Sequence, residues 1–178
     1  MANDLLIVVD MQHDFVDGAL GTPEAQAIVE AVAEHARTFN GSVLFTFDTH
    51  HDDYLSTQEG RKLPVPHCIE GTHGWRLMPG LEEVRRERDA LCFSKPTFGS
   101  TELAKYLGVE NMRESITSVE LCGLCTDICV VSNALLAKAV LPEVPVRVRP
   151  ALCAGVTPEA HKSALTTMQS CQIELVED

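Results

Sequence analysis

The residue that the sequence places best for covalent chemistry is Cys129. It lies in VELCGLCTDICVV (Val119–Val131), where an apolar run passes through a glycine into a Thr-Asp pair that opens a predicted helix. The first turn of a helix carries unpaired amide N–H groups and the positive end of the helix dipole, and both stabilise a thiolate. We therefore expect Cys129 to be a nucleophile with a lowered pKa.

Two charged residues complete a possible reaction centre. Asp10 ends the apolar run LLIVVD, and Lys95 ends the run ALCFSK. A thiol that attacks a carbonyl needs a base for its proton and hydrogen-bond donors for the oxyanion. We expect Asp10 to be the base, and Lys95 to hold the charge of Asp10 and to orient water or the leaving group. Taken singly, each residue also has a structural explanation: a capping carboxylate, a surface lysine and a core thiol.

A second group of residues has the types that bind metal ions. Asp48 and His50 are two positions apart, so on an extended segment they point to the same side, and His67 follows in the same long loop. Two histidines and a carboxylate with open coordination positions suit Zn²⁺, Fe²⁺ or Mn²⁺. His51 and His73 are lower-ranked ligands, and the alternative is a polar loop with solvated histidines.

The pair Cys122-x-x-Cys125 has the spacing of redox and zinc motifs. However, Cys122 lies in an apolar run, and the chain has no second pair with this spacing. Buried free thiols are therefore the favoured interpretation of Cys122, Cys68, Cys92, Cys153 and Cys171.

Composition limits the classes of partner. The formal charge of this 178-residue chain is −12, from 14 basic and 26 acidic residues, which argues against nucleic acid and anionic membranes. No apolar run approaches the roughly 20 residues that span a bilayer. The start MANDLLIVVD lacks a basic region, so we expect no signal peptide, and the seven cysteines are expected as reduced thiols in the cytoplasm.

Six short apolar runs alternate with helical segments over most of a chain that we expect to form one domain, residues 1–178. The runs are Leu5–Val9, Val43–Phe47, Ala90–Phe93, Ser118–Cys122, Val144–Val148 and Gln172–Val176. Near-continuous apolar runs are typical of strands buried on both faces of a parallel sheet. Helices are expected after the Thr22-Pro23 cap, from about Thr126 to Val140, and from about Pro158 to Ser170. The pattern predicts an α/β fold with three layers, α/β/α, around a mostly parallel six-stranded sheet.

This fold explains why the chemically active residues would meet. In an open α/β sheet, ligands bind beyond the carboxyl ends of the strands. Asp10, Asp48, Lys95 and the Gly123–Cys129 turn all lie at such ends. The long segment Asp48–Gly80 has no strong period, and a loop of this length in a compact domain is usually functional.

Several ordered motifs together resemble one family. They are LLIVVDMQHDF (Leu5–Phe15), TFDTH (Thr46–His50), PVPHCIEGTHG (Pro64–Gly74), Lys95 with Phe98-Gly99-Ser100, GLCTDICV (Gly123–Val130) and AGVTPEAHKSAL (Ala154–Leu165). In this order and nearly from end to end, they resemble the isochorismatase-like cysteine hydrolases, the superfamily that includes nicotinamidases.

The resemblance implies a catalytic role for each matching residue. Asp10 would be the general base, Lys95 the supporting cation and Cys129 the nucleophile. The Leu124–Cys125 peptide would be cis and would aim the amide of Cys125, with that of Cys129, at the oxyanion.

It also implies a metal and a pocket. Asp48, His50 and His67 would hold a divalent ion, zinc first and iron or manganese as alternatives, and Phe15 would form one apolar wall. Nicotinamidases usually carry a tryptophan where Pro64 stands, and often a further His or Ser where Ser56 stands. The segment Asp52–Lys62 matches no substrate that we can assign.

The sequence thus predicts a cytoplasmic, nicotinamidase-like cysteine amidohydrolase that acts on a small primary amide. The resemblance implies a homo-oligomer, a dimer or a tetramer. Two alternatives within the superfamily are hydrolysis of an isochorismate-type vinyl ether and hydrolysis of an N-carbamoyl compound. From another class, the alternative is a non-catalytic binding protein of the same fold, which the intact Asp10, Lys95 and Cys129 disfavour.

Overall fold

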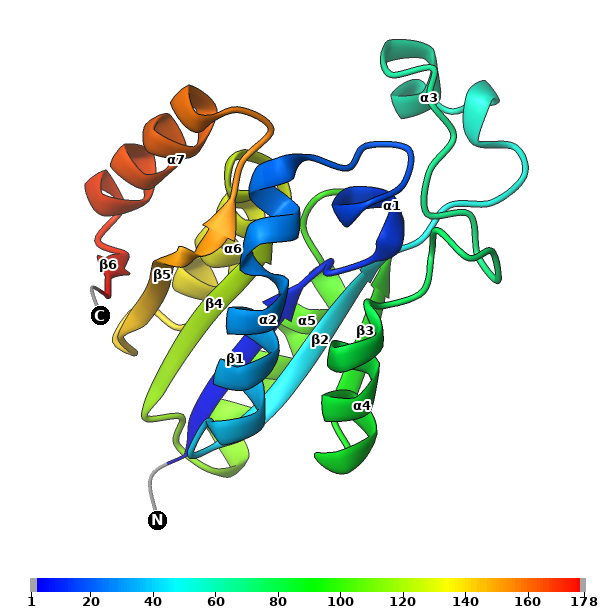
Figure 1. Cartoon of the computed structure of the whole chain (residues 1–178). Coiled ribbons are helices and arrows are strands. Elements are labelled where there is room, and N and C mark those ends of the chain that lie inside the picture. Colours follow the sequence, from blue (N-terminus) through cyan, green and yellow to red (C-terminus); the bar gives the residue numbers. More distant parts are fainter. Residues whose placement is uncertain (1–2, 177–178) are drawn as a thin grey trace.

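A six-stranded parallel sheet forms the centre of the molecule (Figure 1). Residues 3–176 are described by a computed structural model. The strand order is β3-β2-β1-β4-β5-β6, and every neighbouring pair runs parallel. The strands are β1 (Asp4–Val9), β2 (Ser42–Asp48), β3 (Leu91–Lys95), β4 (Ser118–Leu124), β5 (Val146–Ala154) and β6 (Glu174–Leu175). The predicted α/β fold is confirmed.

Helices cover both faces of this sheet. They are α1 (His13–Val16), α2 (Pro23–Thr38), the 3-10 turn η1 (Tyr54–Ser56), α3 (Gln58–Lys62), α4 (Pro79–Glu87), α5 (Thr101–Arg113), the π-helical turn η2 (Thr126–Val130), α6 (Val131–Val140) and α7 (Pro158–Ser170). In Figure 1, α2 and α4 lie in front of the sheet and α5 and α6 behind it. α7 packs against η2 and α6. The three layers therefore match the expected architecture.

The apolar runs form strands because both faces of the sheet are covered. All five residues of Leu5–Val9 in β1 are at most 1% exposed. A strand that is buried on both sides needs apolar side chains at successive positions, and the alternation of a half-exposed strand is lost. Short polar caps then start the helices: the Thr22 hydroxyl accepts the N–H of Ala25 at 3.0 Å, and Ser100 accepts that of Leu103 at 3.1 Å.

The largest departure from the expected elements is β5. The apolar run predicts a strand over Val144–Val148, but the strand covers Val146–Ala154 and continues past Pro150. Its register against β4 shifts between Leu121 and Gly123. An irregularity of this kind tolerates a proline, because a bulge leaves one backbone position outside the ladder. The proline and the arginines therefore do not end this strand.

Two further elements, β6 and α4, differ from the expectation. β6 has only two residues, Glu174 and Leu175, instead of the expected Gln172–Val176. α4 arises from a stretch for which no helix is expected. The segment between β2 and α4 is irregular, as expected for a loop without a strong period, although η1 and α3 lie within it. Among residues 3–176, none of the helices combines the length and apolarity that crossing a bilayer requires.

Removal of one side chain from the centre of the sheet should show how strongly the fold depends on it. Leu121 in β4 is fully buried, and Met112 on α5 is 80% exposed. We expect Leu121→Ala to lower the free energy of unfolding by about 2–5 kcal/mol, because it removes buried methyl groups and leaves a cavity. Met112→Ala should change it by less than about 0.5 kcal/mol. Urea denaturation measures both, and equal losses would contradict this account of the core.

Candidate active site

Four neighbouring strands end beside one another, and each carries a polar side chain there. Asp48 and Lys95 are the last residues of β2 and β3 and are paired in register. Asp10 follows β1 directly, with φ of 48°, a left-handed conformation that Asp tolerates better than most residues. Cys129 lies in η2, just after β4. The expected convergence of four strand ends at one edge of the sheet is therefore observed.

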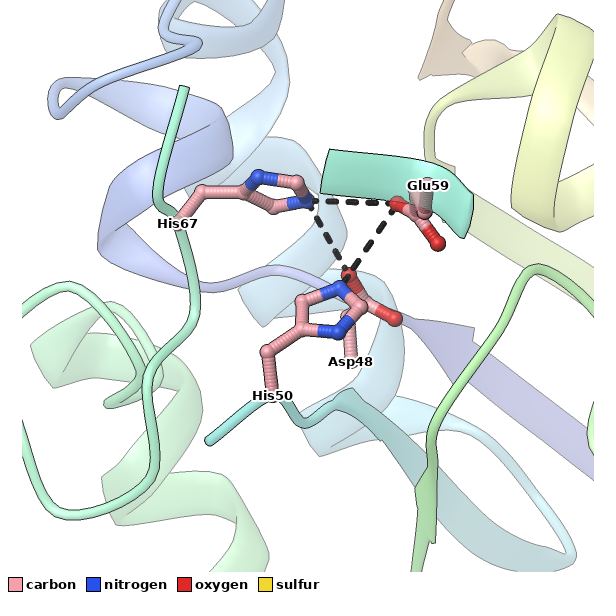
Figure 2. Close-up of side chains that lie close together, drawn as sticks. All are labelled: Asp48, His50, Glu59 and His67. Carbon is pink, nitrogen blue, oxygen red and sulfur yellow. Dashed lines mark hydrogen bonds and ion pairs between the residues drawn. The ribbon is translucent and has the colours of Figure 1, made fainter. Parts of the chain in front are cut away.

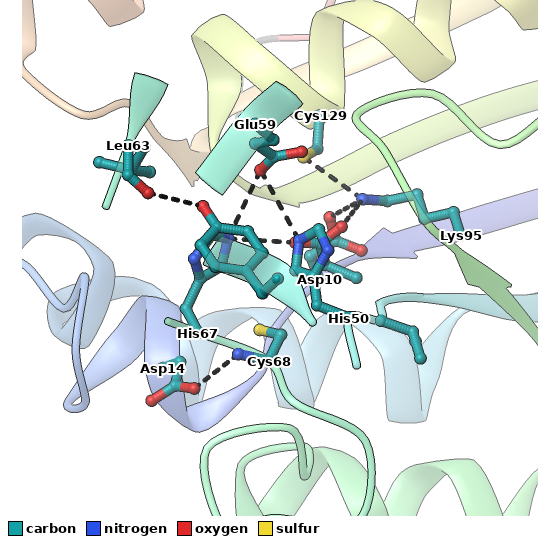
Figure 3. Close-up of polar contacts among 12 residues, drawn as sticks. Asp10, Asp14, His50, Glu59, Leu63, His67, Cys68, Lys95 and Cys129 are labelled. Atoms are coloured by element: carbon teal, nitrogen blue, oxygen red, sulfur yellow. Dashed lines mark hydrogen bonds and ion pairs between the residues drawn. The ribbon is translucent and has the colours of Figure 1, made fainter. Parts of the chain in front are cut away.

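The Lys95 ammonium lies at the centre of this group (Figure 3). Its Nζ atom is 2.6 Å from Oδ2 of Asp10, 3.1 Å from Oδ1 of Asp48 and 3.4 Å from Sγ of Cys129. The residue is 1% exposed. Burial lowers the pKa of Lys95, but the negative groups around it raise that pKa by more than burial lowers it. The ammonium therefore stays protonated. One buried cation thus contacts all three groups.

Asp10 is arranged to accept a proton. Its Oδ1 accepts the hydroxyl of Thr46 at 2.6 Å. Its Oδ2 contacts Lys95 and has no well-aligned hydrogen-bond donor among the described residues. Burial raises the pKa of the Asp10 carboxyl, and this increase outweighs the attraction of the Lys95 charge. A more basic carboxylate with an available oxygen is suited to general-base chemistry.

The thiol of Cys129 differs from the expectation in one respect. The sequence predicts a lowered pKa at the start of a helix, but the side chain is 4% exposed, and burial raises its pKa well above the usual value. The nearby charge of Asp10 acts in the same direction, whereas that of Lys95 opposes it. The predicted direction is wrong, because burial and the neighbouring Asp10 charge disfavour a thiolate at this position. The thiol is therefore protonated until a base removes its proton.

The backbone between β4 and η2 has two features that bear on the expected oxyanion site. The peptide bond between Leu124 and Cys125 is cis, the geometry implied by the resemblance. The N–H of Val130 donates to the carbonyl of Cys125 at 3.1 Å across the π-helical turn. The amide of Cys129 lies one residue earlier, in the first turn, where helix N–H groups lack partners within the helix.

A second cluster, drawn in Figure 2, shares Asp48 with the group around Lys95. It consists of Asp48, His50, Glu59 and His67, and one ligand atom from each lies within 4.8 Å of the others. Oδ2 of Asp48 is 3.1 Å from Nε2 of His50 and 3.5 Å from Nε2 of His67. Oε1 of Glu59 is 3.6 Å and 3.7 Å from the same two nitrogens. All three predicted metal ligands are therefore brought together.

These separations fit a divalent cation. Ligand atoms at about 2.0–2.2 Å from a tetrahedral zinc lie roughly 3.3–3.6 Å from one another. The Nε2 atoms of both histidines face the two carboxylate oxygens, and nitrogen with carboxylate oxygen suits zinc, iron or manganese. Hydrogen bonds from the histidines and the charge of Lys95 hold the pKa of Asp48 well below its usual range, although burial acts in the opposite direction. Asp48 is therefore ionised, as a metal ligand must be.

Glu59 is the member of this cluster that the sequence analysis missed. The resemblance drew attention to Ser56, but Ser56 is exposed and its hydroxyl donates to the carbonyl of Asp53 at 2.7 Å. Glu59 lies three residues later on α3, which starts at the Thr57 cap. A carboxylate in a long histidine-containing loop was the available signal. Burial raises the pKa of Glu59, in addition to the charge of Asp48.

Local contacts orient the two histidine rings. The Tyr54 ring packs against both, with centroid distances of 4.8 Å to His50 and 5.0 Å to His67. The Tyr54 hydroxyl donates to the carbonyl of Leu63 at 2.9 Å, which ties the segment around α3 to the cluster. Nδ1 of His67 contacts the carbonyl of Val65 at 2.8 Å and leaves Nε2 facing Asp48. A fixed second nitrogen is typical of metal-binding histidines.

The segment after β1 holds the other ligand backbones in place. The buried Gln12 side chain accepts the N–H of Asp48 at 2.8 Å and donates to its carbonyl at 2.9 Å. Oδ2 of Asp14 accepts the N–H of Cys68 at 2.7 Å, beside His67. Both residues belong to the opening motif, so that motif supports the cluster as well as supplying Asp10.

A cavity of about 760 Å³ opens beside the two groups. It is lined by His50, Thr57, Gln58, Glu59, Lys62, Leu63, Pro96, Thr97, Phe98, Asp127, Ile128 and Ser132. Its walls therefore come from the α3 segment, the loop after β3, and η2 with the start of α6. This size suits a small organic ligand. Another cavity, of about 770 Å³, lies beside α4 and β3 and is lined by none of the residues that carry the chemistry.

Some candidates from the sequence lie outside this arrangement. Phe15 is buried and packs edge-on against His67, with ring centroids 5.5 Å apart. Like Asp10, Lys95 and Cys129, it is not among the residues that line the cavity, so its expected role as an apolar wall stays a prediction. His51 is exposed, and the His73 ring packs against His13 at 4.0 Å. All seven cysteines are free thiols, but Cys92 and Cys171 are exposed, so the expectation of buried thiols is wrong for these two. The candidate metal site among residues 3–176 contains no cysteine.

Comparisons with known proteins agree with this arrangement. The isochorismatase domain model matches residues 4–177. The nicotinamidase/pyrazinamidase of Mycobacterium tuberculosis is 31% identical over 191 residues, which cover 96% of this chain and 97% of that protein. The crystal structure of pyrazinamidase of Pyrococcus horikoshii in complex with zinc has 30% identity and a TM-score of 0.81, and the match covers 99% of each chain.

A second solved structure has the same shape. The pyrazinamidase/nicotinamidase from Streptococcus mutans has 27% identity and a TM-score of 0.81, and the match covers 98% of this chain and 100% of that one. These matches confirm the family that the motifs resemble. By the domain match over residues 4–177 and the identity to its relatives, the chain belongs to the isochorismatase family.

Proposed function

We propose that this protein is a cysteine amidohydrolase that converts a small primary amide to the acid and ammonia. The single observation that carries the proposal is the position of Lys95, whose Nζ lies within 3.4 Å of Cys129 and closer still to Asp10 and Asp48. The cation thus contacts both the nucleophile and the base. It also contacts Asp48, whose other carboxylate oxygen belongs to the proposed metal ligands. The relatives named nicotinamidase or pyrazinamidase support an amide as the substrate.

The proposed first step uses the geometry of Asp10 and Cys129. Asp10 removes the thiol proton as sulfur attacks the amide carbon, so a C–S bond forms while negative charge moves to oxygen. The amides of Cys125 and Cys129 donate to that oxygen. Asp10 then passes the proton to the departing nitrogen, and the C–N bond breaks. Ammonia departs, and the acyl group remains on Cys129 as a thioester.

The second step regenerates the thiol. Water attacks the thioester carbon, and Asp10 accepts the proton that water loses. The C–S bond breaks, the acid leaves, and the proton returns to the Cys129 sulfur. Lys95 stabilises Asp10 in its ionised form between these transfers, which its 2.6 Å contact with Oδ2 supports.

We also propose that Asp48, His50, Glu59 and His67 hold a divalent ion, zinc first and iron or manganese as alternatives. Their separations fit such an ion, and a similar protein was crystallised with zinc. A bound ion would act as a Lewis acid toward a ligand in its open position. Because His50 and Glu59 also line the cavity, these side chains would present one part of the substrate to the ion while the amide faces Cys129.

The choice of amide rests on the relatives. They include proteins named for nicotinamide and pyrazinamide, and we propose a heteroaromatic amide of similar size as the substrate. Nicotinamidases usually carry a tryptophan at the position of Pro64. In this chain Leu63 and Phe98 supply apolar surface to the cavity. We further propose that the protein works in the cytoplasm as a homo-oligomer, a dimer or a tetramer.

Replacement of the nucleophile tests the reaction. We expect wild-type protein supplied with zinc, manganese or iron to release ammonia from nicotinamide or pyrazinamide. Cys129→Ala should lower this rate by roughly 10⁴-fold or more, because the covalent step is lost. Cys171→Ala removes an exposed thiol and is the matched control, with an unchanged rate. Ammonia release that survives in Cys129→Ala would refute the mechanism, and none from any amide would point to a substrate such as a vinyl ether.

Metal analysis tests the ligand set. After chelation and reloading, we expect about one ion per chain, since the four ligand atoms surround one position. Glu59→Gln should weaken binding at least tenfold (about 1.4 kcal/mol or more) in competition with a chelator, because it removes a charged ligand. Ser56→Ala should bind like wild type, since Ser56 is exposed. Equal affinities for all three proteins would remove Glu59 from the set.

Replacement of Lys95 tests the central contact. In Lys95→Met, two buried carboxylates lose their shared cation, and we expect the free energy of unfolding to fall by about 3–5 kcal/mol. Ammonia release should be lost as well. Lys105→Met changes an exposed lysine on α5 and should alter neither property. Denaturant titration and activity assays measure both, and a stable, active Lys95→Met protein would contradict the assignment.

A further inference from the structure

A buried asparagine on α6 connects two of the segments that line the cavity, the loop after β3 and the turn that carries Cys129. Asn133 is 2% exposed and lies four residues after Cys129. A buried amide side chain must find partners for its donors and acceptor, because an unpaired polar group costs stability. The partners that Asn133 selects therefore indicate what it holds together.

Three hydrogen bonds leave this side chain in two directions. Nδ2 donates to the carbonyl of Cys129 at 2.8 Å and to the carbonyl of Phe98 at 3.1 Å. Oδ1 accepts the N–H of Ser100 at 2.9 Å. One side chain thus fixes the backbone of the nucleophile and, at two points, the loop that follows Lys95.

The contact between this loop and α6 is also sterically close. A Cβ atom added to Gly99 would lie 2.7 Å from Cδ1 of Leu136 and 3.4 Å from Cβ of Ser132, both on α6. A side chain at position 99 would press on Leu136 and Ser132, so the absence of a Cβ atom lets the loop lie close to the helix. Phe98, immediately before it, lines the cavity together with Ile128 and Ser132.

The contacts of Asn133 and Gly99 bear on the distance between Lys95 and Cys129. Lys95 lies three residues before Phe98, and Cys129 lies four residues before Asn133. Lys95 ends β3 immediately before this loop, and its Nζ lies 3.4 Å from Sγ of Cys129. The hydrogen bonds of Asn133 join the same two segments just beyond this contact. A shift of about 1 Å between reacting groups can lower a rate roughly 100-fold.

We propose that Asn133 is a positioning residue that holds the loop after Lys95, residues 96–100, against η2 and α6. In this way it sets both the Lys95–Cys129 contact and the width of the cavity. This inference rests on the proposed function for its effect on turnover. Its structural content does not, because the contact of Lys95 with the Cys129 sulfur can be read without a substrate.

The main test is Asn133→Leu, which keeps the approximate size and removes all three hydrogen bonds. Asn111→Leu is the matched control, since Oδ1 of Asn111 accepts the N–H of Ile116 at 2.9 Å, away from the cavity. We expect kcat/KM per titratable Cys129 to fall roughly 10- to 100-fold in Asn133→Leu, with kcat falling and KM rising. Asn111→Leu should keep the wild-type value per active site.

A second pair of variants moves the loop by a different route. Gly99→Ala should push the loop away from α6 and produce the same loss. Gly108→Ala on α5 is its control, because an added Cβ there meets no atom within 4 Å. If Asn133→Leu does not fold, this pair tests the proposal alone. Wild-type turnover per active site in Gly99→Ala or in Asn133→Leu would overturn it.

A substrate-independent measurement separates this proposal from the proposed function. The pH midpoint for alkylation of Cys129 by iodoacetamide should move upward in Asn133→Leu and Gly99→Ala, because Lys95 retreats from the sulfur and favours the thiolate less. If wild-type protein releases no ammonia but this shift occurs, the proposed function fails and the positioning role stands. An unchanged midpoint in both variants overturns the positioning role whatever the substrate.

Discussion

The buried ammonium of Lys95 is the constraint on which the rest of the site depends. A cation that is 1% exposed must be paired, because the loss of hydration costs several kcal/mol. Its partners come from three other strand ends: Asp10 after β1, Asp48 at the end of β2 and Cys129 beyond β4. Parallel strands place these ends at one edge, so the sheet topology and the charge pairing support each other.

Asp48 links the group around Lys95 to the candidate metal site. Its Oδ1 contacts Lys95, and its Oδ2 faces His50 and His67. Each oxygen of one carboxylate therefore serves a different group, and a change on one side alters the charge that the other side meets. The backbone of Asp48 is in turn held at both its N–H and its carbonyl by Gln12. This arrangement makes the two groups one electrostatic unit.

The segment between β2 and α4 completes the site without regular structure of any length. Tyr54 packs on both histidine rings and ties its hydroxyl to Leu63, and Glu59 reaches the cluster from the single turn of α3. The same segment forms one wall of the cavity, and the loop held by Asn133 forms another. Two walls of the cavity therefore come from loops that a few specific contacts hold in place.

The sequence by itself determined the features that local patterns encode. Continuous apolar runs predict buried parallel strands, and polar residues at their ends predict Asp10, Asp48, Lys95 and Cys129 at one edge. Only the tertiary structure decided what non-local packing controls. Glu59 joins the cluster because α3 folds over the histidines, and β5 continues past Pro150 because its register against β4 shifts. The pKa of Cys129 rises rather than falls because folding buries the thiol and places Asp10 beside it. Such outcomes depend on distances between residues far apart in the chain, and neither spacing nor composition carries that information.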